Sequence, residues 1–522
     1  MRGRSALRLA VMQLFVLMLV MGLLVADEAG PVAWGPDDRG GWEIAGLIAA
    51  AIGPYLAPVL FAAASCGAAA RTLRRRPERA ARAVAGANLT ISLARLVVVG
   101  VFFYSLFGLG WLAFLDRALG EWVLVNDLLA LAPPLAAATA TWWSYYPIER
   151  RLREQSMIRQ IDAGEPIRAV PPRGAYVVEQ VRHHLLLMLA PMLAILAWAQ
   201  AVEALLPASM MRRASGTAVV FAGAAAVFAL APMMIRFIWR TEPMPDGALR
   251  RRLLELCRRH AVRVRELLVW RTHSGMVNGA VIGLVGPLRY ILLTDGLIER
   301  LDDRQVEAVM AHELGHVRRR HMPWMAVCAL GTLGAVFTLI DLAASALAGA
   351  GLIDPVGGSV LTVDPMGHGT AANLATAGAL VVGIGAWAVA FGYVSRRFER
   401  QADTFAVQHL AAKRAEAEAH GGAGAGRDGR ARAGGASGGG GALIDAGSVE
   451  AMAGALRSVA SLNASPAGRR SWRHGSIRWR VEYLQSLVGT PIDRCAIDGR
   501  VRMIQWGCAV LLAASALAQS RF

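Results

Sequence analysis

Residues 301–320 read LDDRQVEAVMAHELGHVRRR, and this stretch governs how the rest of the chain is interpreted. It predicts a single helix, because Asp302 or Asp303 can cap the N-terminus and the arginines at 318–320 suit the negative end of the helix dipole. Apolar residues recur in it at helical spacing. They predict one buried stripe, made of Val306, Val309, Met310, Leu314 and Val317.

The same helix carries residues that suit a metal ion. His312 and His316 are four residues apart, so both imidazoles project from one face and can bind the same ion. Glu313 lies one step round the helix, where its carboxylate can reach a metal-bound water without being a ligand. The pattern indicates a zinc site that activates water, and the alternative is a surface helix with two histidines.

Zinc in a catalytic site needs a third protein ligand and an open fourth position. The metzincin arrangement is excluded, because Met322 occupies the position at which that class places its third histidine. His321 is out of phase with the two motif histidines, and we expect it to be structural. Glu399 is the better candidate for the third ligand, and Asp403, one helical turn later, is expected to accept the second ring N–H of a ligand histidine.

Apolar blocks of about 20 residues, long enough to cross a bilayer, dominate the rest of this 522-residue chain. They lie at 9–25, 44–68, 90–113, 122–143, 184–206, 217–238, 323–347 and 373–394, with a shorter block at 503–518. The pattern predicts a mainly α-helical, polytopic membrane protein of about eight or nine spans. Whether the last block spans the bilayer stays open, and we favour an uncleaved helix over a signal peptide for the first.

The net charge of +17 comes from basic runs that flank the apolar blocks. This distribution is typical of cytoplasmic loops and argues against a nucleic-acid partner. It predicts an integral protein of the bacterial inner membrane, with the loop that carries the metal motif on the cytoplasmic side. Five scattered cysteines encode neither a disulfide framework nor a cysteine zinc site.

Residues 266–271, 280–284 and 288–293 predict short strands before the motif helix, and hence a small β-sheet in the catalytic domain. An edge strand of such a sheet could hold an extended peptide by backbone pairing. The expected organisation is 1–240 as a transmembrane region of six spans, 241–321 as catalytic strands and motif helix, 322–394 as a transmembrane hairpin, 395–412 as the helix of the third ligand, 413–448 as a glycine-rich flexible linker, 449–500 as a C-terminal helical part of the catalytic domain and 501–522 as an apolar tail.

The combination of HELGH, a transmembrane hairpin and Ser395-Arg-Arg-Phe-Glu399-Arg-Gln-Ala-Asp403 resembles the integral-membrane gluzincins that include the CAAX prenyl endoproteases and the HtpX heat-shock proteases. Asn278-Gly-Ala280 and the segment from Leu293 to Ile298 are similar to that family's approach to its active site. Residues 474–484 resemble its C-terminal HPSxxxRI element, with Gly475 where the family usually has proline. The resemblance covers about residues 250–410 and 450–485.

The resemblance implies that His312, His316 and Glu399 are the ligands of one Zn²⁺ and that Glu313 is the catalytic base. Asp403 would support a ligand, and His474 and Arg480 would bind substrate or stabilise the oxyanion. By the same resemblance, Asn278, Gly279 and Ala280 would contact the substrate. The alternative for His474 and Arg480 is a solvated basic turn.

These inferences predict a zinc-dependent endopeptidase that cleaves membrane-associated, lipidated or misfolded proteins at the cytoplasmic face. The expected partners are a polypeptide substrate and the lipid bilayer. A non-catalytic membrane scaffold that keeps zinc for structure is the alternative, although it would have no reason to retain Glu313. A transporter is the weakest hypothesis, because only Asp127 and Asp341 stand out as intramembrane charges.

Overall fold

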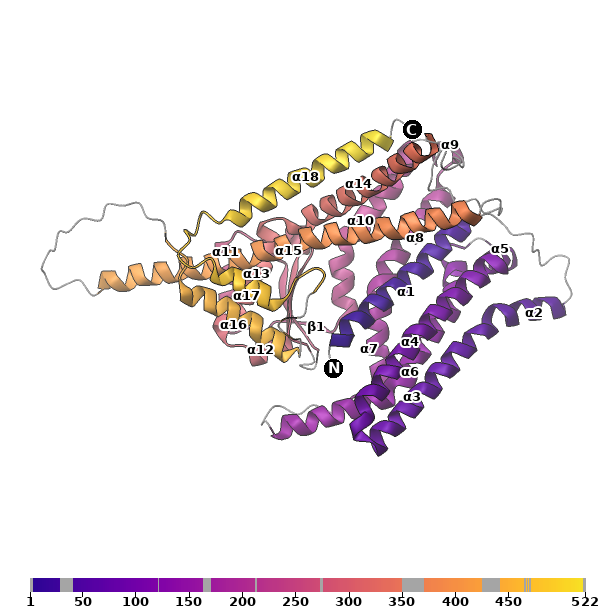
Figure 1. Ribbon diagram of the computed structural model, residues 1–522, viewed down its shortest axis with the longest axis horizontal. Coiled ribbons are helices and arrows are strands. Elements are labelled where there is room, and N and C mark those ends of the chain that lie inside the picture. The colour runs from indigo at the N-terminus through magenta and orange to yellow at the C-terminus, as the bar shows by residue number, and fades with distance from the viewer. Residues whose placement is uncertain are drawn as a thin grey trace, which may run out of the picture. The chain divides into compact units, whose positions relative to one another are not determined.

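The structure is a computed structural model, and it describes residues 3–28, 41–120, 122–162, 170–211, 214–272, 276–349, 370–424, 442–463, 466, 468 and 471–519. The chain forms two compact units, Met1–Thr241 and Glu242–Phe522. Figure 1 shows the order of their elements. Residues 425–441, within the expected glycine-rich linker, and residues 350–369 lie outside the described residues.

The first unit is built mainly of helices in its described residues. Its elements are α1 (Gly3–Glu28), α2 (Gly41–Ile52), η1 (Gly53–Tyr55), α3 (Leu56–Arg75), η2 (Pro77–Arg79), α4 (Ala80–Phe103), η3 (Tyr104–Gly108), α5 (Trp111–Leu119), α6 (Val125–Asp162), α7 (Arg173–Gln180), η4 (Val181–Leu186), α8 (Leu187–Leu205), α9 (Ala208–Met211) and α10 (Ala214–Ile238). The turns η3 and η4 are π-helical and continue the helices before them. Four stretches of this unit are long and apolar enough to cross a membrane, namely Gly41–Arg75, Pro77–Gly108, Arg173–Leu205 and Ala218–Ile238.

The second unit combines a small sheet with helices. Its elements are β1 (Thr241–Pro243), which starts at the unit boundary, α11 (Ala248–Arg259), β2 (Glu266–Trp270), β3 (Gly279–Ile282), η5 (Gly286–Leu288), β4 (Tyr290–Thr294), α12 (Asp295–Arg300), α13 (Asp303–Arg318), α14 (His321–Gly349), α15 (Thr370–Gly424), α16 (Ala446–Leu462), α17 (Ile477–Gln485) and α18 (Ala496–Gln519). Two further candidate spans, His321–Ala343 and Ala496–Ala518, bring the number among the described residues to six. The short C-terminal block is therefore part of a helix long enough to span.

The sheet has the strand order β1-β2-β4-β3. Strand β2 pairs in parallel with β4, whereas β3 pairs antiparallel with β4 and forms an edge. The three predicted strands are present, and β1 was not predicted. All five residues of β4 are buried, as expected for a strand covered on both faces.

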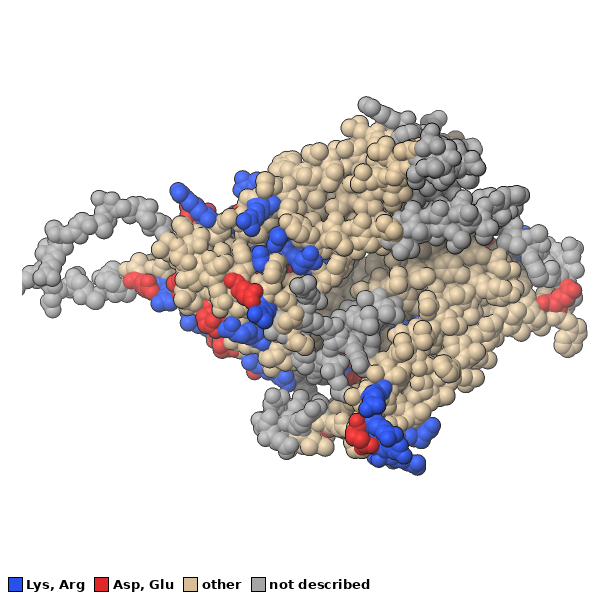
Figure 2. All heavy atoms as spheres, in the orientation of Figure 1, with Lys and Arg blue, Asp and Glu red and all other residues tan. Residues whose placement is uncertain are grey.

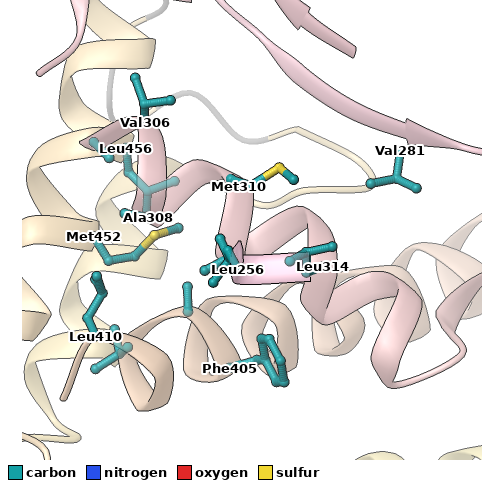
Figure 3. Packing of buried hydrophobic residues seen from close by; sticks show 14 of the residues in the cluster. Leu256, Val281, Val306, Ala308, Met310, Leu314, Phe405, Leu410, Met452 and Leu456 are labelled. Atoms are coloured by element: carbon teal, nitrogen blue, oxygen red, sulfur yellow. The ribbon is translucent and has the colours of Figure 1, made fainter. Parts of the chain in front are cut away.

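Helix α13 lies at the centre of the core of the second unit. Val306, Met310 and Leu314 are 1%, 0% and 0% exposed, and Val309 and Val317 pack against the same cluster at its margin. Figure 3 shows α13 with side chains of α11, α15 and α16 around it. The predicted apolar stripe is thus the core-facing side of α13, and burial of side chains of this size stabilises the fold by about 1.5–3 kcal/mol each.

Helices α14, α15 and α18 pack beside one another (Figure 1). Gly331 of α14 lets α18 approach closely, because a Cβ there would lie 2.3 Å from the carbonyl oxygen of Cys508. The outward side chains of α14 are apolar, with Leu330, Leu339 and Leu342 more than half exposed. Figure 2 shows charged side chains over the strand-and-helix part of this unit and near the start of α18, whereas the rest of the described length of α18 that faces the viewer carries none. Long helices with an apolar outer surface are typical of membrane-spanning segments.

Helix α15 is longer than the sequence suggested. It continues through residues 413–424, where we expected the flexible linker to begin. Alanine, glutamate and arginine dominate residues 411–418, and these are strong helix formers. The third-ligand helix and the second arm of the hairpin are therefore one element.

Candidate metal centre

Asp302 caps the N-terminus of helix α13, and its side chain accepts a hydrogen bond from the backbone N–H of Gln305 at 2.8 Å. This cap fixes where the helix starts and hence which side chains face inward. His312 is buried and His316 is partly buried. Their Nε2 atoms lie 3.3 Å apart.

Glu399 comes from the middle of α15. Its carboxylate oxygens lie 3.7 Å from Nε2 of His312 and 3.7 Å from Nε2 of His316. Ligand atoms of these three residues all lie within 4.8 Å of one another, and they make up the candidate metal-binding group found among the described residues. The structure therefore brings together the three ligands predicted from sequence.

Gly315 allows α13 and α15 to come close enough for this. A Cβ at Gly315 would lie 3.2 Å from the Cα of Ala402 and 3.2 Å from the Cβ of Phe405, tighter than ordinary contacts. Any larger residue would push the α15 backbone, and Glu399 with it, away from the histidines. The glycine of HELGH therefore has a packing role.

The donor set fits zinc. Two nitrogens bound to a tetrahedral ion at about 2.0–2.1 Å lie roughly 3.3–3.4 Å apart, which matches the separation of the two Nε2 atoms. Each outer nitrogen has a polar atom close to it, because His312 Nδ1 lies 2.9 Å from Asp403 Oδ1 and His316 Nδ1 lies 2.9 Å from His321 Nδ1. If both outer nitrogens donate, the two facing Nε2 lone pairs need a shared cation between them.

Asp403 is fully buried and is itself held by Arg480 of α17. The guanidinium donates two hydrogen bonds to this carboxylate, from Nε to Oδ2 at 2.7 Å and from Nη2 to Oδ1. Its Nη1 atom lies 3.3 Å from Oε2 of Glu399. Burial raises the pKa of Asp403, but Arg480 overrides this and holds the pKa below its usual range. The carboxylate therefore stays ionised beside His312.

The ring of His312 responds to this neighbour. Burial lowers the pKa of His312, but Asp403 outweighs burial and the net shift is upward. Burial dominates at His316 and holds its pKa well below the usual range. Burial also raises the pKa of Glu399, yet His474 and Arg480 bring it well below the ordinary value. The centre thus presents a neutral imidazole and an ionised carboxylate, as metal ligands must be.

His321 was expected to be out of phase with His312 and His316. That expectation assumed that one continuous helix carries all three residues. Arg320 has φ +53°, a left-handed conformation that separates α13 from α14. The break turns the chain and places the His321 ring beside His316 and against Phe398, with ring centroids 4.6 Å apart. Sequence reasoning missed this contact, because three consecutive arginines give no signal for a left-handed residue.

Glu313 lies beside the edge strand β3. A Cβ at Gly279 would lie 3.5 Å from the Cγ of Glu313, so only a small residue leaves this approach open. Burial raises the pKa of Glu313 to about 7, with His312 opposing and the Glu399 carboxylate adding to the effect. A carboxylate with a pKa near neutrality can both accept and release a proton.

The side chain of His474 is 56% exposed, and its Nδ1 lies 3.0 Å from Oε1 of Glu399. It stands in a tight turn in which Gly475 N–H donates to Ser471 O at 3.0 Å and Gly475 has φ +74°. Proline, which the resembled family usually has there, is restricted to φ near −65°. The turn at His474 is thus built differently here, and its neighbour Trp472 donates to the carbonyl of Ala388 on α15 at 2.6 Å.

Comparison with models of protein families shows which family the region around this centre matches. Residues 243–426 match the family model described as Peptidase family M48. These residues are an M48 peptidase domain. The M48 domain includes His312, Glu313, His316, Glu399 and Asp403, and it makes the chain a metalloprotease.

His474, Arg480 and α18 lie beyond the matched range of the M48 domain, although they pack against it. A search of curated proteins finds no match. Among solved structures, the crystal structure of S. mikatae Ste24p aligns over 85% of this chain and 99% of that one, at 15% identity and a TM-score of 0.35. The assignment of residues 243–426 rests on the family match, and the described residues contain six helices long and apolar enough to cross a membrane.

Proposed function

We propose that the chain is a zinc-dependent endopeptidase that hydrolyses peptide bonds of membrane-associated, lipidated or misfolded proteins at the cytoplasmic face of a bacterial inner membrane. The observation that carries this proposal is the position of Glu313. It lies beside both the His312–His316–Glu399 group and the edge strand β3, where a base and a bound peptide would meet.

His312, His316 and Glu399 would hold the zinc ion, which when bound supplies a water acidic enough to lose a proton near neutral pH. Glu313 is not a ligand and takes that proton on its carboxylate. The same carboxyl group then donates the proton to the nitrogen of the leaving amine. Both steps need a carboxyl group beside the metal that is not itself a ligand, because only such a group is free to accept a proton and then release it.

Strand β3 would hold the substrate. The backbone N–H of Thr294 donates to the carbonyl of Asn278, so Asn278 and alternate residues after it direct their backbone groups toward β4. Gly279 and Val281 therefore direct theirs outward, to the edge beside Glu313. A peptide added there in extended form is bound through its backbone, which requires little side-chain specificity.

His474 and Arg480 have different parts in this proposal. The exposed imidazole of His474 can reach a substrate and donate to the oxygen that gains negative charge as the carbonyl is attacked. Arg480 is buried, with its guanidinium on Asp403 and Glu399. It therefore acts through those two carboxylates, and we assign it to positioning of the centre.

The cytoplasmic placement rests on the basic runs in the loops next to the apolar helices. Both arms of the hairpin formed by α14 and α15 return the chain to the metal centre, since His321 opens one and Glu399 follows the apolar part of the other. A centre built at the ends of spanning helices reaches substrates that lie at the bilayer surface.

The test compares the wild type with Glu313→Gln, which keeps the shape of the side chain but cannot accept the proton. In membranes that carry each protein, quantitative proteomics should show substrates that accumulate and copurify with the variant alone. Purified variant should contain as much zinc as the wild type, and Glu255→Gln, a change at an exposed glutamate of α11, should leave cleavage intact. Equal cleavage by wild type and Glu313→Gln would reject the proposal.

A further inference from the structure

Helix α18 contributes a carboxylate to a chain of hydrogen bonds that ends on the metal ligand His316. Gln401 Nε2 donates to Asp498 Oδ1 at 2.6 Å, and Gln401 Oε1 lies 2.8 Å from His321 Nε2. His321 Nδ1 in turn lies 2.9 Å from His316 Nδ1. The second oxygen of Asp498 accepts a hydrogen bond from Arg319 at 3.0 Å.

The two middle groups of this chain are shielded from water, with His321 1% and Gln401 5% exposed. A buried polar group without a partner costs about 1–3 kcal/mol, so each of these groups depends on the next one. His321 is further held by its ring stacking on Phe398, at an interplanar angle of 10°. The chain therefore has one geometry, fixed by packing.

The carboxylate sets the direction of every proton in the chain. Asp498 can only accept, so the amide nitrogen of Gln401 faces it and the amide oxygen faces His321. His321 must then carry its proton on Nε2, which leaves Nδ1 as an acceptor. His316 consequently donates from Nδ1, and its Nε2 lone pair is directed toward His312 and Glu399.

We propose that Asp498 is a positioning residue of the metal centre, which acts through Gln401 and His321 to hold His316 in the tautomer that binds the metal through Nε2. This inference rests on the metal site of the proposed function. It gives each ligand histidine its own carboxylate: Asp403 acts directly on His312, and Asp498 acts on His316 through two intermediates. It also makes the C-terminal helix, outside the matched family region, part of the centre.

The test measures zinc affinity by competition with a chelator, in full-length protein in detergent. Gln401→Met removes both hydrogen bonds of the amide at similar volume, and Asp498→Leu removes the carboxylate. Both should weaken zinc binding about 10–100-fold, the range found for outer partners of metal ligands. Asp498→Asn, which still offers an oxygen to Gln401, should restore most of the affinity, whereas Asp493→Leu, a change at an exposed carboxylate just before α18, should have no effect.

A spectroscopic measurement on the wild type covers the case in which a variant does not fold. With ¹⁵N-labelled histidine in metal-free protein, the ring-nitrogen shifts of His316, assigned by difference from His316→Gln, should be those of the tautomer protonated on Nδ1. A His316 ring protonated on Nε2 alone would overturn the proposal. So would zinc affinity of folded Gln401→Met within twofold of the wild type. A protein that meets these expectations but cleaves no substrate would reject only the endopeptidase function.

Discussion

Arg480 and Asp403 form a buried, two-point ion pair between helices α17 and α15, although they are 77 residues apart in the sequence. Asp403 is in turn 2.9 Å from His312, and Arg480 is 3.3 Å from Glu399. One guanidinium thus contacts one ligand, Glu399, directly and a second ligand, His312, through Asp403. Because the pair has almost no access to water, its loss cannot be compensated by solvent.

Replacement of Arg480 should therefore damage both stability and the metal centre. Arg480→Met leaves Asp403 as a buried charge without its partner, which costs about 3–5 kcal/mol. We expect a lower unfolding temperature in detergent and weaker zinc binding. Arg478→Met, at an exposed position on the same helix, should change neither. If Arg480→Met kept the wild-type unfolding temperature, the pair would have no structural role.

Zinc binding should release a proton from Glu313 at slightly acidic pH. In the metal-free centre burial raises the pKa of Glu313 to about 7, so at about pH 6.5 much of this group is protonated. A nearby dication favours the ionised form, and the proton leaves when zinc binds. At about pH 8.5 the group is already ionised, and no such release occurs.

Calorimetry in buffers of different ionisation enthalpy measures this release. At about pH 6.5 the wild type should release more protons per zinc than Glu313→Gln, and at about pH 8.5 the two should release the same number. If His312 also releases a proton when zinc binds, it does so in both proteins, and the difference between them is unchanged. Equal release at the lower pH would show that Glu313 is ionised before the metal binds.

Gly475→Pro, which restores the residue usual in the resembled family, should impair this protein. Proline cannot adopt φ +74°, and it removes the N–H that bonds to Ser471. We expect His474 to move and kcat/KM to fall at least about tenfold, with zinc retained because no ligand lies in this turn. Gly475→Asn keeps the N–H, and asparagine tolerates positive φ. Its kcat/KM should therefore fall less than that of the proline variant, despite its contact with Trp479. Full activity of the proline variant would show that the position of His474 is unimportant.

Gly315→Val should separate the two ligand helices. The added side chain meets the Ala402 backbone of α15, so the helix must shift and carry Glu399 outward. We expect a loss of about 1–3 kcal/mol in stability, together with weaker zinc binding. Gly385→Val is the matched control, because a Cβ at that glycine of α15 meets nothing within 4 Å. Zinc affinity equal to that of the control would contradict the packing role of Gly315.

Much of the site could be predicted because helical spacing is local. The four-residue interval places His312 and His316 on one face, and the same interval relates Glu399 to Asp403. Hydropathy likewise predicted the apolar helices and placed the short strands of the catalytic part close to where they are found. The extension of α15 beyond residue 412 was missed, because the composition of the following glycine-rich segment outweighed that of its first residues.

The sequence by itself determined the chemistry of this protein: which side chains can bind a metal, which can carry a proton, and which segments can lie in a bilayer. Those properties follow from residue type and from spacing within one helix. Tertiary structure decided how the ligands are supported. The left-handed Arg320 turns His321 onto His316, and the packing of α17 and α18 brings Arg480 and Asp498 to the centre. No local pattern encodes these contacts, because they join helices whose relative positions are set by the burial of apolar faces distant from the metal centre.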